Sequence, residues 1–197
     1  VGGVRRSALI SLSSPTSDRL AQAKSGAWYN TDGQRALANN SACYEQKPDF
    51  HFYMNQAKSL YESYSGERGF FNREAADKII ESHGRRETGH KWGCNPCSEI
   101  ILRPSEFCNL SEVIVRCDDS LVDLLEKVDV ATIFGTLQST LTDFRYLRKV
   151  WKDNCEEERL LGVSLTGIMD HPVLNGSSGD EMLEEWLTTM REHAITV

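Results

Sequence analysis

The sequence lacks any apolar run long enough to span a membrane, and it lacks the charged-then-apolar N-terminus of a secretory signal. We therefore expect no membrane partner and a cytoplasmic location, in the host cytoplasm if the protein is viral. An excess of positive charge is also missing, because the net charge is −7. This charge argues against nucleic acid as a partner, although a locally cationic pocket would still accept a nucleotide.

Cysteine is scarce: six residues in a chain of 197 are too few for a small domain held together by disulfides. In a reducing compartment, clustered cysteines are more often metal ligands or catalysts. Residues 91–117, "KWGCNPCSEIILRPSEFCNLSEVIVRC", contain Cys94, Cys97, Cys108 and Cys117. Cys43 and Cys155 are isolated in the sequence, so we expect both to be buried, inert thiols.

The composition that is present, 40% hydrophobic and 26% charged, is ordinary for a globular protein. The length suits one domain with a real core or two small ones. No repeat and no convincing domain boundary is visible, and residues 171–180 are the most linker-like stretch. Because the chain begins at Val1 without methionine and stops within a helical pattern, we expect an internal piece of a longer protein.

Strand and helix patterns alternate along the chain, which predicts an α/β fold. Extended segments are expected at 1–12, 38–44, 99–102, 112–116 and 160–167. Helices are expected within 15–26, from Asp49 to about residue 65, from Asn72 to Gly84, from Asp118 and Asp119 to 128, over 130–154, and over 179–194. The aromatic residues recurring at helical spacing over 50–64 are predicted to face the core.

The cysteine cluster can be interpreted without catalysis, as a structural zinc site within a binding module. Cys94 and Cys97 have the spacing of a compact two-ligand knuckle. Cys108 and Cys117, however, are nine residues apart with an apolar run between them, so we expect no metal site. Metal analysis would decide between a zinc module and an enzyme. A non-catalytic nucleotide-binding regulator is a third alternative, and it would tolerate Cys97→Ser.

The residues around Cys97 suggest chemistry. In an extended segment, alternate side chains project to one side, so the Asn95 amide, the Cys97 thiol and the Glu99 carboxylate would converge. Pro96 stiffens this segment. A carboxylate beside a thiol disfavours the thiolate, which argues against a protease-type nucleophile. A neutral thiol that gives up a hydrogen atom tolerates Glu99, which is then available as a general base.

These motifs resemble a known family. "NPCSEI" followed by "FCNLSEV", with Cys97 and Cys108 eleven residues apart, is similar to the active-site region of the ribonucleotide reductase catalytic chain. The resemblance is to the adenosylcobalamin-dependent kind, the class II monomeric ribonucleoside-triphosphate reductases and their phage relatives. Four further stretches are family-like and occur in the family's order over nearly the whole chain: residues 2–8, 35–44, 65–73 and 160–170.

The resemblance implies that residues 1–197 are part of a ten-stranded α/β barrel whose central finger loop carries the radical cysteine. It implies a radical-based reduction of ribonucleotides to 2′-deoxyribonucleotides for DNA synthesis, and we expect the substrates to be ribonucleoside triphosphates. Adenosylcobalamin would generate a thiyl radical on Cys97, which abstracts the 3′ hydrogen of the ribose. Glu99 would be the general base, Asn95 would bind the ribose hydroxyls, and Cys108 would be one half of the reducing dithiol, with its partner upstream of Val1.

The resemblance also implies partners: a ribonucleotide substrate, thioredoxin or a similar dithiol reductant, and a nucleotide effector. Candidate substrate-binding residues are Asn39, Asn40 and Ser41, for which a capped turn is the alternative, together with Gly3 and Arg5. The family's C-terminal cysteine pair and phosphate-binding segment are not among these residues, so we expect the 197 residues alone not to turn over. The alternative within the family is a class I ribonucleoside-diphosphate reductase large subunit, and dependence on adenosylcobalamin would decide.

Overall fold

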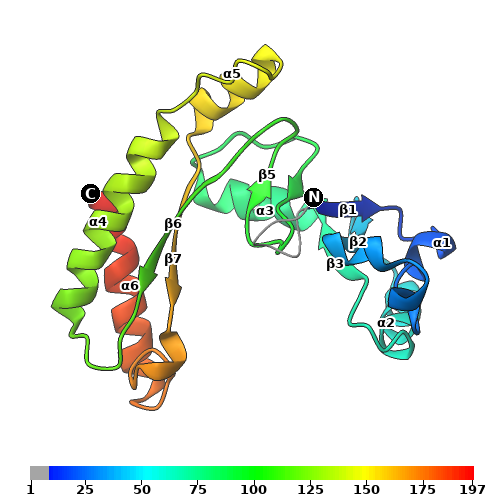
Figure 1. The fold of residues 1–197 in the computed structure, drawn as a ribbon, viewed down its shortest axis with the longest axis horizontal. Coiled ribbons are helices and arrows are strands. Elements are labelled where there is room, and N and C mark those ends of the chain that lie inside the picture. Colours follow the sequence, from blue (N-terminus) through cyan, green and yellow to red (C-terminus); the bar gives the residue numbers. More distant parts are fainter. Residues whose placement is uncertain (1–8) are drawn as a thin grey trace. The chain divides into compact units, whose positions relative to one another are not determined.

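A computed structural model describes residues 9–197, with side-chain surroundings from Ile10 onward. Gly3, Arg5 and most of the strand expected over 1–12 therefore lie outside the described residues. The chain divides into two compact units, Val1–Pro104 and Ser105–Val197, and each is described by itself. Parallel strands and helices alternate in both units, which confirms the α/β class (Figure 1).

The first unit contains a three-stranded parallel sheet in the order β1-β2-β3. Its strands are β1 (Leu9–Ser13), β2 (Ala38–Tyr44) and β3 (Gly69–Asn72). The short helix α1 (Asp18–Ala21) and two 3-10 turns (Trp28–Asn30 and Gly33–Leu37) connect β1 to β2. Helix α2 (Phe50–Glu62) connects β2 to β3, as a parallel pair requires (Figure 1).

The helix boundaries of this unit follow from capping residues. The Asp49 carboxylate accepts hydrogen bonds from the N–H groups of His51 and Phe52, at 3.0 and 3.2 Å, and so begins α2. The Asn72 side chain accepts from the N–H of Ala75 at 3.0 Å and begins α3 (Arg73–His83). Gly84, with φ of 61°, ends α3 in the left-handed conformation. These boundaries agree with the sequence prediction.

The prediction that the aromatic stripe of residues 50–64 forms core is wrong for this chain. Helix α2 has no buried residue, and the exposed fractions of Phe50 and Tyr61 are 69% and 81%. The helix contacts the sheet through Tyr53, whose ring centroid lies 5.1 Å from that of Phe70. A sheet of three short strands is too narrow to cover a stripe that extends over the whole helix.

A hairpin of very short strands completes the first unit. Strand β4 (Gly93–Cys94) pairs antiparallel with β5 (Ile101–Leu102). The fully buried Trp92 precedes β4 and packs against α3, in a cluster with Ala76, Ile80, Phe71 and Ile101. The hairpin is therefore attached to the unit at its base.

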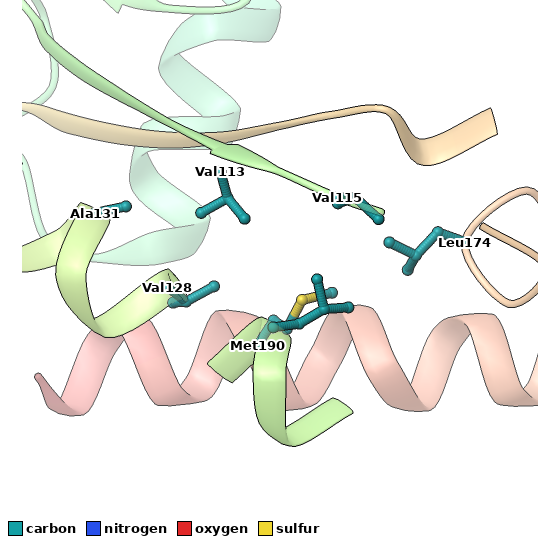
Figure 2. Packing of buried hydrophobic residues seen from close by; sticks show 7 residues of the cluster. Val113, Val115, Val128, Ala131, Leu174 and Met190 are labelled. Atoms are coloured by element: carbon teal, nitrogen blue, oxygen red, sulfur yellow. The ribbon is translucent and has the colours of Figure 1, made fainter. Parts of the chain in front are cut away.

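The second unit pairs β6 (Asn109–Ile114) in parallel with β7 (Leu161–Thr166). Its helices are α4 (Leu121–Ser139), α5 (Lys149–Glu158) and α6 (Asp180–Thr196), with a 3-10 turn at Ile168–Asp170. Helix α4 packs on both strands and against α6 (Figure 1). Figure 2 shows the core between them, which consists of Val113, Val115, Leu124, Val128, Ala131, Leu174 and Met190.

Two helix predictions in this unit need correction. Helix α4 begins after Ser120, not at Asp118, because Ser120 and Asp123 form a capping box in which each side chain accepts a backbone N–H. The continuous helix predicted over 130–154 is wrong, since α4 ends at Ser139 and α5 begins at Lys149. Within residues 9–197, every helix is too short or too polar to cross a lipid bilayer.

Candidate active-site hairpin

The residues predicted to carry the chemistry lie in the turn that joins β4 to β5. The Asn95 side-chain oxygen accepts the N–H of Ile100 at 3.0 Å, and the N–H of Asn95 donates to the Ile100 carbonyl at 3.3 Å. The N–H of Ser98 donates to the Asn95 carbonyl at 2.9 Å, and Ser98 has a φ of 66°. Residues 95–100 are therefore a closed turn, not an extended segment. The premise that residues 95, 97 and 99 alternate along a strand is wrong.

The turn places the thiol and the carboxylate in solvent. Cys97, Ser98 and Glu99 are exposed, whereas Asn95 is half-buried. The Asn95 oxygen closes the turn, and within residues 9–197 no acceptor pairs with its Nδ2 amide. The turn therefore carries an exposed thiol, an exposed carboxylate and, on the half-buried Asn95, an amide donor without an acceptor among residues 9–197. Pro96, which fixes its own φ and has no N–H, interrupts the ladder at this point.

The second thiol of the C-x2-C pair has the opposite environment. Cys94 is buried on β4, and its Sγ lies 3.5 Å from the Ser98 hydroxyl. Burial raises the pKa of the Cys94 thiol and the nearby Glu99 carboxylate adds to that rise, while the Ser98 hydrogen bond opposes it. Cys97 is thus the accessible thiol of the pair.

Cys43 was expected to be a buried thiol, and this is confirmed. Burial is the main reason that its pKa is raised. The described cysteines form no disulfide with one another. Among the residues that the structure describes, no three His, Cys, Asp or Glu side chains are grouped so that they could hold a metal ion.

The base of the hairpin is fixed by polar contacts as well as by packing. The Trp92 indole N–H donates to Asp77 Oδ1 at 2.6 Å, and the same oxygen accepts the N–H of Gly89 at 3.0 Å. These two hydrogen bonds lower the pKa of the Asp77 carboxyl group. The Arg73 Nε donates to the Trp92 carbonyl at 2.8 Å. The strands of the hairpin therefore emerge from a rigid base on α3.

The proposed substrate-side residues on β2 contact the protein itself. The side-chain amide of Asn39 donates to the carbonyl of Pro96, next to Cys97. The Asn40 side chain donates to the Leu20 carbonyl at 2.6 Å, and Ser41 is buried. Their contact with a substrate remains a prediction. The contact between Asn39 and the hairpin was not foreseen, because a separation of 57 residues leaves no local signal in the sequence.

Cys108 lies in the second unit, just before β6, and is half-buried. It lines a cavity of about 710 Å³ together with Phe107, Phe144, Tyr146 and the buried Cys155. The segment preceding Cys108 packs on α5, since the Phe107 ring centroid lies 4.6 Å from that of Trp151. Because Cys97 and Cys108 belong to different units, their approach to one another remains a prediction.

A second cavity of about 650 Å³ in this unit lies between β6 and α4. Apolar side chains of Ile114, Val130 and Phe134 line it, with Asp119 and Lys127 at hydrogen-bond distance, 2.5 Å, from each other. None of the residues predicted from the sequence to act on a substrate lines this cavity.

Comparison with known proteins confirms the predicted resemblance. The chain is 31% identical over 182 residues to an adenosylcobalamin-dependent ribonucleoside-triphosphate reductase of Lactobacillus gasseri, and 29% identical over 180 residues to that of Lactobacillus helveticus. Each match covers 86% of this chain and 22% of the relative. A Dictyostelium discoideum protein named as a probable reductase of the same kind is 28% identical over 193 residues, which is 94% of this chain and 24% of the relative.

The chain therefore spans about a fifth of the length of the curated relatives that it matches. No protein-family model and no solved structure matches the chain.

Proposed function

We propose that this chain is the segment of an adenosylcobalamin-dependent ribonucleoside-triphosphate reductase that carries the radical cysteine, Cys97. The observation that supports this most directly is the accessible Cys97 thiol at the tip of a hairpin, two residues before the exposed Glu99. The similarity to reductases of this kind over 86% of the chain supports a role of that thiol in ribonucleotide reduction. The ten-stranded barrel, in which this hairpin would be the finger loop, is part of the same proposal.

In the proposed reaction, the thiyl form of Cys97 takes the 3′ hydrogen atom of the ribose. Glu99 accepts the proton of the 3′-hydroxyl group and returns it at the end of the cycle, and the 2′-hydroxyl leaves as water after it takes one proton from the dithiol that contains Cys108. Cys108 and a second thiol outside this chain provide two electrons and two protons, and they become a disulfide. Cys97 then returns its hydrogen atom to the 3′ carbon. The net change replaces the 2′-hydroxyl by hydrogen and oxidises one dithiol, which thioredoxin or a similar dithiol would reduce again.

The Asn95 amide would orient the sugar. Its oxygen is committed to Ile100, so its Nδ2 group is the part that can donate to a ribose hydroxyl. The side chains of Asn39 and Asn40 on β2 donate to carbonyl groups of the protein, and Ser41 is buried. We therefore assign ribose recognition to Asn95 and Glu99.

Adenosylcobalamin, when bound, supplies the organic radical that removes the hydrogen atom from the Cys97 thiol. The chain fits such a group because the thiol to be oxidised is exposed, while the neighbouring Cys94 is buried. Cys97 therefore meets a cofactor from the solvent side of the turn. A nucleotide effector is a further proposed partner.

Two alternatives have less support. The relatives are named as cobalamin-dependent triphosphate reductases, which favours that class over a diphosphate reductase large subunit. A zinc-stabilised module would need both thiols of the C-x2-C pair on one side, whereas Cys94 is buried and Cys97 exposed.

The test uses the protein at its full encoded length, with adenosylcobalamin, a dithiol and a ribonucleoside triphosphate, and measures the deoxyribonucleotide formed. We expect activity in the parent protein, none in Cys97→Ser, and at least half of the parent activity in Cys94→Ser, which is the matched control three residues away. The proposal is refuted if Cys97→Ser retains the parent rate, or if the parent forms product equally well without the cofactor.

A further inference from the structure

The tip of the hairpin is connected to the parallel sheet by one side chain from β2. The Asn39 side-chain amide donates a hydrogen bond to the carbonyl oxygen of Pro96. This carbonyl belongs to the peptide group whose nitrogen is that of Cys97, and the group is planar and rigid. We infer that Asn39 is a positioning residue that fixes Cys97 relative to the sheet. Its consequence for catalysis rests on the proposed function, whereas the contact itself does not.

The hairpin needs such an anchor because its own ladder is minimal. Only two residue pairs join its strands, Gly93 with Leu102 and Cys94 with Ile101. A two-stranded hairpin is marginally stable by itself in water. The hydrogen bonds between Asn95, Ser98 and Ile100 determine the shape of the turn, but they do not attach it to anything else.

Two arginine side chains attach the hairpin below its tip. Arg73 holds the Trp92 carbonyl at 2.8 Å, and Arg86 holds the Ile101 carbonyl at 2.8 Å. Both carbonyls lie outside the 95–99 segment, so the base can stay in place while the tip moves. The bond from Asn39 is the contact that reaches the peptide group at Cys97.

Strand β2 is a suitable support for this contact. It is the central strand of the sheet, and Asn39 itself pairs with Ile10 of β1. The next residue, Asn40, is held by its side chain at the Leu20 carbonyl and by its N–H at Glu67 Oε2, 3.0 Å away. A short side chain on a strand fixed in this way has little freedom to follow a moving tip.

Hydrogen–deuterium exchange in the full-length protein tests the anchor without any cofactor. The measured quantity is the exchange rate of the Asn95, Ser98 and Ile100 amides within residues 95–100, whose hydrogen bonds close the turn. We expect Asn39→Ala to raise that rate about fivefold, the change in open population that follows from losing one net hydrogen bond. Asn39→Asp, which keeps the shape but loses the donor, should do the same. Asn39→Gln, which retains the donor, should return the rate towards that of the parent.

Asn40→Ala is the matched control, because it removes the same kind of side-chain bond from the neighbouring position, directed at residue 20. We expect it to leave exchange at 95–100 within about twofold of the parent. The inference is overturned if Asn39→Ala leaves tip exchange unchanged, or if Asn40→Ala raises it equally, since the effect would then be general loosening of β2. If Asn39→Ala loosens the whole unit, the comparison of Asn39→Asp with Asn39→Gln decides: equal tip exchange in the two overturns it.

Kinetics separate positioning from substrate binding. A misplaced Cys97 lowers kcat by a larger factor than it raises KM for the nucleotide, because hydrogen-atom transfer depends more steeply on the position of the thiol than ribose binding does. A direct role of Asn39 in holding the nucleotide predicts the reverse, a raised KM with no change in tip exchange, and that result would also overturn the inference. If the parent protein shows no reductase activity, the proposed function fails while the exchange data still decide whether Asn39 anchors the turn.

Discussion

Replacement of Trp92 by phenylalanine tests the claim that the hairpin rests on a rigid base. The Trp92 side chain is fully buried, and its indole N–H donates to Asp77 at 2.6 Å. Trp92→Phe keeps an aromatic ring in the cluster with Ala76 and Ile80 but removes this donor. The Asp77 oxygen would then retain the Gly89 N–H as its partner.

The magnitude follows from two contributions. A hydrogen bond to a charged acceptor contributes about 1.5–3 kcal/mol, and the lower end applies because Asp77 is partly exposed. The smaller ring leaves unfilled volume in a site with no exposure, which adds about 1 kcal/mol. We therefore expect Trp92→Phe to lower the free energy of unfolding of the first unit by about 2–3 kcal/mol.

A double-mutant cycle isolates the hydrogen bond. Asp77→Asn keeps an acceptor of similar shape and should cost about 1 kcal/mol. Once Trp92→Phe is present, the loss of the Asp77 charge should matter less, so the double variant should fall short of additivity by about 0.5–1 kcal/mol. Urea unfolding followed by exchange of the amides in residues 89–102 measures each value. Additivity within about 0.3 kcal/mol would refute the assignment of this bond as the link between hairpin and helix.

The pH dependence provides an independent check on the same pair. The pKa of Asp77 is lowered in the folded state, so its contribution is present above the ordinary Asp value of 3.8 and is lost as the pH falls through the lowered pKa. The difference in stability between the parent and Asp77→Asn should therefore shrink on acidification below that value. A difference that grows on acidification would contradict the assigned direction.

Three further substitutions test the second unit. Gly167→Ala should destabilise it by about 2–4 kcal/mol in urea unfolding, because Gly167 has a φ of 79° and a Cβ there would lie 2.5 Å from the Val115 carbonyl oxygen; a loss below about 0.5 kcal/mol would contradict this. Leu124→Ala should cost about 2–5 kcal/mol, since Leu124 is fully buried in the core, and an unchanged unfolding midpoint would show that the core is misplaced. The Lys127 hydrogen bond lowers the pKa of Asp119, so the stability that this pair contributes above pH 3.8 should be lost as the pH falls through the lowered pKa. Asp119→Asn should therefore reduce the loss of stability on acidification, and an identical loss in both proteins would contradict the pairing.

Sequence patterns predicted those features that are determined locally. Asp49 and Asn72 begin helices because each side chain satisfies free N–H groups of its own first turn, and Gly84 ends one because it adopts a positive φ. The strands at 38–44 and 160–167 were also identified, and the second of them is rich in apolar residues and contains the β-branched Val163 and Thr166. In these cases, the signal and the structure lie within a few residues of one another.

Features that depend on distant partners were not predicted. The apolar spacing over 130–154 fits one helix, yet residues 140–148 leave the helical conformation, and the Thr142 hydroxyl donates to Glu156 at 2.8 Å. The boundary between the units, after Pro104, carries no linker-like composition. The Asn39 contact with Pro96 joins residues 57 positions apart. Local composition contains no information about any of these.

The C-N-P-C motif has the cysteine spacing of a metal-binding knuckle, and the same spacing is compatible with a single reactive thiol. The turn between Cys94 and Cys97 decides between these two functions. Cys94 pairs with Ile101 in the ladder and faces the protein, where burial raises its pKa. The turn that begins at Asn95 and Pro96 then changes the direction of the chain, so Cys97 emerges in solvent. A metal knuckle would need the two sulfurs to converge, whereas hydrogen-atom chemistry needs a single accessible thiol. The Asn-Pro pair between the cysteines, and not the spacing of the cysteines, therefore favours the radical function.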